Sequence, residues 1–233
     1  ANDTVALAAN SISLTATATD KDGDKATQTV NLGAGFVFTD DAPTVTATAS
    51  NVTTLTVDET TLATNASASF ANVFTVNYGA DGAGSTAYAL AVVNAASGLV
   101  DTATGQAVSM SVDASGNVVG KNTNGDTVFT ISVSSAGVVT LDQARAVMHA
   151  DGSNANDTVA LAANSISLTA TATDKDGDSA SQTVNLGAGF VFTDDAPTVT
   201  ATASNVTTLT VDETTLATNA SASFANVFTV NYG

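Results

Sequence analysis

The strongest constraint on this chain is a long internal repeat. Residues 1–79 recur as residues 155–233, an offset of 154 residues, and only two of the 79 aligned positions differ. The two differences are Lys25, which becomes Ser179, and Thr27, which becomes Ser181. A period of this length is too long for one turn of a solenoid and fits a whole domain repeated head to tail. The chain therefore contains one full period and about half of the next.

Two prolines mark the phase of the repeat. Pro43 and Pro197 lie one period apart, each at the end of a Thr-Asp-Asp-Ala-Pro segment. Proline fixes its own φ and pushes the preceding residue into extended geometry, so this acidic segment suits a rigid linker. We place the complete domain at 41–194, between the C-terminal part of a preceding repeat (1–40) and the N-terminal part of the next (195–233). In the alternative phase the units are 1–79 and 155–233, with 80–154 between them.

Alternating apolar and polar residues predict strands along most of the chain. Leu55 and Val57 alternate with polar residues, as do Phe129, Ile131 and Val133. Threonine on the other face is typical of antiparallel strands with one solvated face. Dipeptides of Asp, Ser or Asn followed by glycine lie between these runs and predict hairpins and turns. They are Asp22-Gly23, Asp81-Gly82, Ser97-Gly98, Ser115-Gly116, Asn124-Gly125 and Asp151-Gly152. The stretch 141–149 fits either a short helix or a strand that ends in a loop. The expected class is all-β, an immunoglobulin-like antiparallel β-sandwich repeated in tandem.

The charge balance and the composition argue against several kinds of binding partner and catalytic chemistry. The chain has 22 acidic against 5 basic side chains and a net charge of −17, which disfavours nucleic acid and anionic membrane. It has no cysteine, so it has neither disulfides nor thiolate chemistry. A single histidine, His149, excludes a multi-histidine metal site and argues against a histidine-based triad. No apolar run approaches the length of a membrane-spanning helix.

Two copies of an aspartate-rich turn predict a hard-cation site. Three carboxylates at alternate positions around a glycine can converge on one ion, and calcium takes six to eight oxygens in irregular loops. The position of the glycine and the lack of a later glutamate exclude an EF-hand. The alternative is a solvated hairpin turn. The residues are Asp20, Asp22 and Asp24, with copies Asp174, Asp176 and Asp178.

Further acidic pairs lie at the linker and after a predicted strand. The linker segment resembles the acidic-Ala-Pro junction of cadherins, where calcium stiffens the joint between successive sandwiches. We therefore predict calcium at the joint, with the aspartate-rich turns and the strand-end pair completing each site; the alternative for that pair is an exposed strand end. A polar loop at 151–157 is a weaker candidate, more simply explained as a loop. The pairs are Asp40-Asp41 and Asp194-Asp195 at the linkers, and Asp58-Glu59 and Asp212-Glu213 at the strand ends.

An ordered set of motifs carries a family resemblance. The set includes Thr-Asp-Asp-Ala-Pro, then Val57-Asp-Glu-Thr60, Gly98-Leu-Val-Asp-Thr-Ala-Thr-Gly105, Leu141-Asp-Gln-Ala-Arg-Ala-Val147 and Leu168-Thr-Ala-Thr-Ala-Thr-Asp-Lys-Asp-Gly-Asp178. Over its whole length the chain resembles the tandem repeat of giant type I-secreted RTX adhesins of Gram-negative bacteria. The resemblance implies calcium-binding extender domains that hold an adhesive tip away from the cell in adhesion and biofilm formation. It also implies secretion as an unfolded chain, with folding triggered by extracellular calcium.

The expected function is therefore a structural spacer, with neighbouring repeats and head-to-tail copies of the chain as partners. The alternative is a ligand- or carbohydrate-binding module, but the chain has three tyrosines, all in strand-like runs, and no tryptophan to line a ligand site. We expect no enzyme, because Asp58 and Glu59 would point to opposite faces of a strand.

Overall fold

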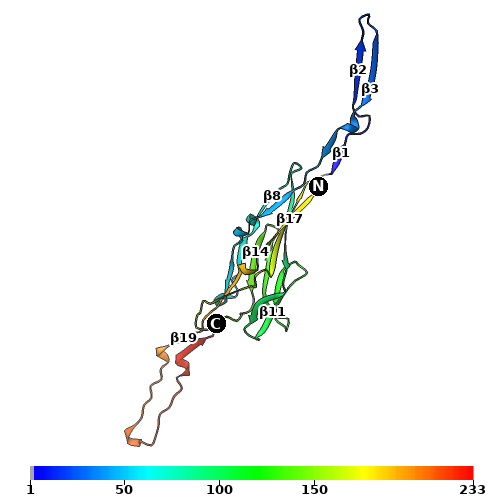
Figure 1. Ribbon diagram of the computed structural model, residues 1–233. Coiled ribbons are helices and arrows are strands. Elements are labelled where there is room, and N and C mark those ends of the chain that lie inside the picture. The colour runs from blue at the N-terminus through cyan, green and yellow to red at the C-terminus, as the bar shows by residue number, and fades with distance from the viewer. Residues whose placement is uncertain (1–2, 233) are drawn as a thin grey trace.

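The computed structural model describes residues 3–232, and their regular structure is almost entirely β-strand. Figure 1 shows an elongated molecule with a central body and a long arm at each end. We call these parts the N-terminal arm (residues 3–40), the sandwich (residues 41–194) and the C-terminal arm (residues 195–232). The predicted all-β class is confirmed. No helix among the described residues has the length and apolarity needed to cross a lipid bilayer.

One face of the sandwich is a six-stranded antiparallel sheet. Its strand order is β10(Ala96–Asp101), β11(Gln106–Val112), β12(Val118–Lys121), β13(Thr127–Val133), β14(Val138–Gln143) and β7(Ala66–Ser69). Phe129 and Ile131 alternate along β13 with half-buried threonine and serine and are themselves completely buried. The period-2 pattern of the sequence thus points one face of this sheet into the core.

Shorter sheets form the opposite layer. They are β17(Ser179–Asn185)-β16(Ile166–Asp174)-β9(Ala83–Val92), β15(Thr158–Ala160)-β18(Phe190–Thr193)-β6(Leu55–Asp58), and the pair β5(Thr44–Ala47)-β8(Phe74–Asn77). The rings of Phe129 and Phe192 join the two layers, with centroids 5.6 Å apart. These layers enclose one hydrophobic core, as expected for a β-sandwich.

One strand pair departs from the antiparallel expectation. Strands β6 and β18 run parallel, in a register that pairs Val57 with Phe192 and Asp58 with Thr193. The two strands lie more than 130 residues apart in sequence, and parallel pairing needs such a crossover connection rather than a hairpin. Because the strands are parallel, the residues that follow them leave the sheet at the same edge.

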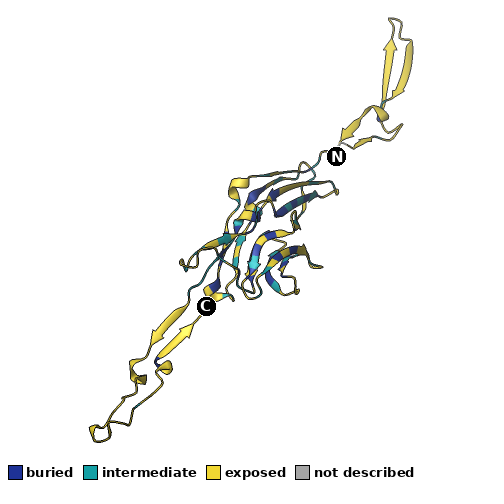
Figure 2. Ribbon diagram, turned by 60° about the horizontal axis from the view of Figure 1, so that its bottom comes forward, coloured by how far each residue is buried: buried dark blue, intermediate teal, exposed yellow. Residues whose placement is uncertain are grey.

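The two arms carry strands without a core. The N-terminal arm holds the pair β1(Thr4–Ala6)-β4(Val37–Thr39) and the hairpin β2(Ser13–Thr19)-β3(Lys25–Asn31). The C-terminal arm holds the pair β19(Thr198–Ala201)-β20(Phe228–Asn231). Figure 2 shows both arms almost wholly exposed and the burial concentrated in the sandwich.

The core lies inside the domain that the prolines predicted. All its buried members fall between Leu55 and Phe192, and no sheet of the described chain pairs a strand of 3–40 with a strand of 43–79. The repeat boundary itself stays a prediction, because a core shows where this chain packs and not where the repeat begins.

Single turns of 3-10 helix connect several strands. They are η1(Gly33–Gly35), η2(Ala49–Asn51), η3(Glu59–Thr61), η4(Ala71–Val73), η5(Gly187–Gly189), η6(Ala203–Asn205), η7(Glu213–Thr215) and η8(Ala225–Val227). The stretch 141–149 is the end of β14 followed by a loop, so its helical alternative is wrong. Ser97-Gly98 is also not a hairpin turn: it lies within β10, where the pairing register with β11 shifts and Gly98 has a φ of +82°.

Candidate metal centres at the two ends of the sandwich

Four groups of side chains in residues 3–232 could each hold a cation. In each group three residues offer ligand atoms that lie within 4.8 Å of one another. Three groups contain only aspartates, and two of these share Asp176. The groups are Asp20-Asp22-Asp24, Asp40-Asp81-Asp176, Asp174-Asp176-Asp178 and Glu59-His149-Asp194.

The turn between β16 and β17 carries the group Asp174-Asp176-Asp178. Asp174 ends β16, and its Oδ1 accepts hydrogen bonds from the backbone N–H groups of Gly177 at 3.1 Å and Asp178 at 2.8 Å. Gly177 has a φ of +108°, which few other residues adopt. Asp174 is only 3% exposed, and its Oδ2 has no hydrogen-bond partner. A buried carboxylate oxygen without a donor is costly, and a bound cation would remove that cost.

The N-terminal arm and a second turn bring further carboxylates to this place. Asp40 follows β4 at the end of the arm, and Asp81 lies in the turn between β8 and β9. Both line a cavity of about 430 Å³ together with Asp176. We call Asp40, Asp81, Asp174, Asp176 and Asp178 the joint cluster.

Three aspartates of the joint cluster, Asp40, Asp81 and Asp176, have a raised pKa. The neighbouring side chain of Asp174 is the main cause of a raised pKa at Asp176. The side chain of Asp41 likewise raises the pKa of Asp81, and burial, followed by the side chain of Asp178, raises that of Asp40. Like charges held together disfavour ionisation, whereas a cation among them would favour it. Asp41 also accepts a hydrogen bond from the Ala80 N–H at 3.0 Å, which fastens the linker to the β8–β9 turn.

The first copy of the aspartate-rich turn has the same local geometry in a different place. Asp20 Oδ1 accepts hydrogen bonds from the N–H groups of Gly23 at 3.1 Å and Asp24 at 2.9 Å. This turn lies at the tip of the β2–β3 hairpin, at the far end of the N-terminal arm (Figure 1). The expectation that it completes a site with Asp40 and Asp41 is therefore wrong. The second copy of the turn takes that position, because only that copy packs in the sandwich.

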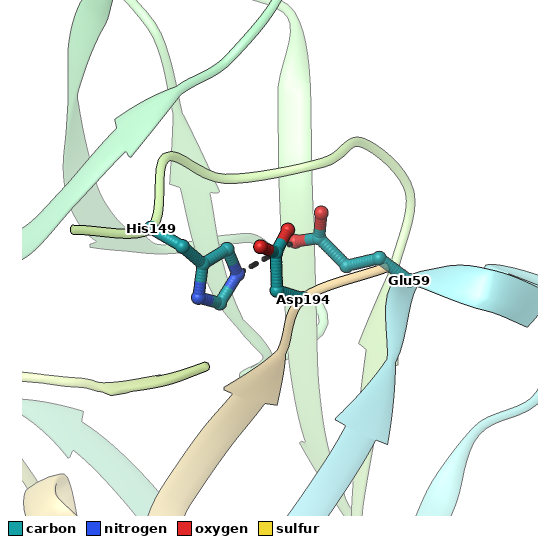
Figure 3. Close-up of side chains that lie close together, drawn as sticks. All are labelled: Glu59, His149 and Asp194. Atoms are coloured by element: carbon teal, nitrogen blue, oxygen red, sulfur yellow. Dashed lines mark ion pairs between the residues drawn. The ribbon is translucent and has the colours of Figure 1, made fainter. Parts of the chain in front are cut away.

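The other end of the sandwich carries a mixed group, which we call the histidine site: Glu59, His149 and Asp194. The parallel register of β6 and β18 sends Glu59 and Asp194 out at the same sheet edge. His149 arrives on the loop after β14, and its Nε2 lies 3.5 Å from Glu59 Oε1. Figure 3 shows the imidazole directed at the two carboxylates.

Glu59 is the fixed member of the histidine site. Its Oε1 accepts hydrogen bonds from Gln143 Nε2 at 2.7 Å and from the Val147 N–H at 2.8 Å. The residue is 8% exposed, and burial raises the pKa of its carboxyl, partly opposed by these donors. Glu59 therefore lies beside Asp194 of the outgoing linker and not beside Asp40 of the incoming one.

The remaining predicted residues do not join a group of three ligands in the described chain. Asp58 caps η3 by accepting from the Thr60 N–H at 2.9 Å. The side chain of Thr60, followed by its backbone N–H, lowers the pKa of Asp58. Asp212 caps η7 in the same way, and Glu213 is exposed beside it. Asp195 lines a cavity of about 350 Å³ next to Asp194. The weaker loop candidate closes on itself, since Asp157 Oδ2 accepts from the N–H groups of Ala150 and Asp151.

Comparison with known families assigns the chain to a sequence family. The profile of a family described as a domain of unknown function (DUF5801) matches residues 1–33 and 54–187. The chain belongs to the DUF5801 family. Both matched segments end at the same position of the repeat, because Gly33 and Gly187 are 154 residues apart. No curated protein and no solved structure matches the chain.

The sequence patterns did not identify two ligand candidates of the DUF5801 domain, Asp81 and His149. Asp81 stood out only as the start of an Asp-Gly turn, and His149 only as the single histidine. Each joins carboxylates that lie far from it in sequence, at Asp176 and at Glu59. Nothing in the local sequence of either residue signals those partners, because the sheet topology alone brings them together.

Proposed function

We propose that the chain is a structural spacer repeat of a secreted bacterial adhesin and that calcium binds at the joint cluster. The observation that carries this proposal is Asp174 Oδ2, which is buried without a hydrogen-bond partner among four further carboxylates. Among the described residues, no lysine or arginine forms an ion pair with Asp174. A cation is the simplest group that would satisfy it.

The donor set of the joint cluster fits calcium. It offers only carboxylate oxygens, from two turns and a linker, with no imposed octahedral symmetry. Calcium accepts six to eight oxygens in such irregular arrangements, whereas magnesium demands near-ideal octahedral geometry. Extracellular modules bind calcium at about 10⁻⁴ to 10⁻³ M, so such a site fills outside the cell and empties inside it.

The shape of the molecule supports a spacer. The two arms leave the sandwich at opposite ends (Figure 1), as successive repeats of a fibre would. The joint cluster combines Asp40 from the N-terminal arm with residues of the sandwich, so an ion there would stiffen the connection between units. Near-identity of the two copies suits a module that provides length, and we propose no catalytic role.

Apolar side chains on the arms support head-to-tail association of chains. Leu14 and Phe38 of the N-terminal arm are 57% and 58% exposed, and Phe228 of the C-terminal arm is 55% exposed. Leu168 and Phe192, the second-copy equivalents of Leu14 and Phe38, are buried. Phe74, the first-copy equivalent of Phe228, is buried as well. Unpaired strand edges attract other chains. We therefore propose that the C-terminal arm of one chain packs on the N-terminal arm of another, which imitates the parent fibre.

Thermal unfolding tests the calcium site. Millimolar Ca²⁺ should raise Tm relative to EDTA, since a ligand at 100 times its Kd stabilises the folded state by about 2.7 kcal/mol. Asp176→Asn should reduce this rise, because Asp176 belongs to both acidic groups of the joint cluster. Its matched control is Asp22→Asn, the same substitution in the first copy. This variant should leave the rise unchanged, because the N-terminal arm shares no core with the sandwich whose unfolding sets Tm. An equal Tm with and without calcium in the wild-type chain would refute the proposal.

A further inference from the structure

We propose that the histidine site binds a zinc-type divalent ion, which fastens the outgoing linker to the sandwich. The ligands are the carboxylates of Glu59 and Asp194 and the Nε2 of His149. This site lies at the opposite end of the sandwich from the joint cluster and does not depend on calcium binding there.

The first observation is a buried imidazole without a hydrogen bond. The His149 side chain is 3% exposed, and neither ring nitrogen has a hydrogen-bond partner in the described chain. Nε2 faces Glu59 Oε1 at 3.5 Å, which is long for a hydrogen bond. A buried polar nitrogen aimed at two carboxylates is the arrangement that a cation between them would satisfy.

The second observation is that one carboxylate is already held in place. Glu59 Oε1 receives two hydrogen bonds, from Gln143 and from the Val147 backbone. Groups outside the ligand set that orient a ligand in this way are typical of built metal sites. Gln143 ends β14 and is 2% exposed, so the support comes from the rigid sheet.

The donor chemistry selects the ion class. Calcium and magnesium take oxygen ligands, whereas an imidazole with two carboxylates suits zinc and its neighbours in the transition series. The three ligand atoms lie within 4.8 Å of one another, so small side-chain rotations would bring them around one ion. A cavity of about 350 Å³ adjoins the three residues and leaves room for a water as a fourth ligand.

The repeat limits the chain to one such site. His149 is the only histidine, and it lies outside the duplicated segments. Glu213, the copy of Glu59, is exposed and has no imidazole partner. Zinc should therefore bind this site at one ion per chain, and His149 reports on it alone.

Imidazole NMR tests the proposal directly on the full chain. In buffer with millimolar Ca²⁺, one equivalent of Zn²⁺ should shift the ring resonances of His149, whereas Ca²⁺ alone should leave them in place. Resonances that stay unmoved with excess Zn²⁺ would overturn the proposal. Displacement of Zn²⁺ by millimolar Ca²⁺ would also overturn it, because the site would then be an ordinary calcium site.

Variants locate the ion. Asp194→Asn and Glu59→Gln should each weaken Zn²⁺ affinity by about 10-fold or more, measured by the same titration. The matched control for the second variant is Glu213→Gln, which should bind Zn²⁺ like the wild type. Asp194 is half-buried in the linker, so its variant keeps the test valid if Glu59→Gln unfolds. Wild-type affinity in Asp194→Asn would place the ion elsewhere and refute the site.

The outcome is separable from that of the calcium proposal. The calcium test reads the Tm of the chain in the absence of zinc, and the zinc test reads one imidazole with calcium already saturating. A chain that gains stability from calcium but shows no His149 shift retains the first proposal and loses the second. If zinc shifts the His149 resonances but calcium leaves Tm unchanged, the calcium proposal is refuted and the zinc proposal stands.

Discussion

At the residue scale, an ion pair between Arg145 and the buried Asp101 joins two segments of the sandwich. Asp101 is fully buried, and its two oxygens accept from Arg145 Nε at 3.1 Å and Nη2 at 3.0 Å. Thr104 and Asn122 also donate to Oδ2, at 2.6 and 2.9 Å. Arg145 is the main cause of a strongly lowered pKa at Asp101. This carboxylate ties β10 to the loop after β14, the same loop that delivers His149.

Asp101→Asn should destabilise the chain. We expect a loss of roughly 3 kcal/mol, the lower end for a broken buried pair because the Arg145 side chain is 30% exposed. Chemical denaturation measures the loss, and Asp142→Asn on the exposed face of β14 is the control, expected within about 0.5 kcal/mol of wild type. A loss no larger than that of the control would contradict the assigned role.

The ion pair of Asp101 and Arg145 makes the stability of the chain depend on pH. The folded-state pKa of Asp101 lies below its unfolded value, so its contribution is complete above the unfolded pKa of about 3.9 and is lost as pH falls below it. The stability difference between the wild type and Asp101→Asn should therefore shrink as the pH drops below about 4. Denaturation curves at a series of pH values would show this, and a difference that grows toward acid pH would be inconsistent with it.

The ring of Phe129 lies so close to the backbone at Gly120 that a side chain has no room there. A Cβ at this position of β12 would lie 2.2 Å from Phe129 Cε1, in the middle of the core. Gly120→Ala should cost about 1–3 kcal/mol through overpacking. Gly152→Ala is the control, since a Cβ there meets nothing within 4 Å. Equal denaturation midpoints for the two variants would show that the ring yields without cost.

At the element scale, two nearly identical hairpins stand in different surroundings. The β2–β3 hairpin is exposed on both faces, whereas β16 of the second hairpin packs against β9 and buries Leu168. Both hairpins carry cross-strand hydroxyl pairs, such as Thr15–Thr29 at 2.8 Å and Thr169–Thr183 at 2.7 Å. Local sequence therefore builds the hairpin, and burial decides whether it contributes to the core.

The paired leucines of these hairpins provide a matched test. Leu168→Ala should cost about 2–5 kcal/mol, because it empties a site in a closed core. Leu14→Ala, the same change at a 57% exposed position, should cost less than about 0.5 kcal/mol. Urea denaturation of the two variants measures both. Similar losses would mean that the N-terminal arm packs as firmly as the sandwich.

At the scale of the whole molecule, one cooperative unit carries two arms. The arms share no core with the sandwich, so they should add little to the free energy of unfolding. A shortened chain of residues 40–195 should unfold in EDTA within about 2 °C of the full chain, measured by calorimetry. A fall well beyond that range would show that the arms stabilise the sandwich through contacts of their own.

Several features of the fold could be predicted from local sequence. The alternating pattern gave the all-β class, and the glycine at each aspartate-rich turn gave the hairpin. Both copies of that turn form the same bonds, with Asp20 N–H and Asp174 N–H each donating to the carbonyl four residues later at 3.0 Å. These bonds close within five residues and need no distant partner, so each copy forms them alone.

The candidate sites needed the tertiary structure. The carboxylates of the aspartate-rich turn and the linker were visible as a pattern, but their partners Asp81 and His149 were not. Asp194 meets Glu59 because β6 and β18 pair in parallel, a topology that no local pattern indicates. Contacts between distant segments depend on how the sheets close around the core, and alternation fixes only which face of each strand is apolar.

The duplicated segment separates the two contributions within one molecule. Residues 55–58 form strand β6, but the identical residues 209–212 form no strand. The first copy has β18 beside it to accept and donate backbone hydrogen bonds, and the second copy would need the next repeat for that pairing. The sequence by itself determined the turns, the hairpins and the apolar faces. The tertiary structure decided which of these faces are buried and which carboxylates meet, because a strand forms only where a neighbouring strand satisfies its backbone.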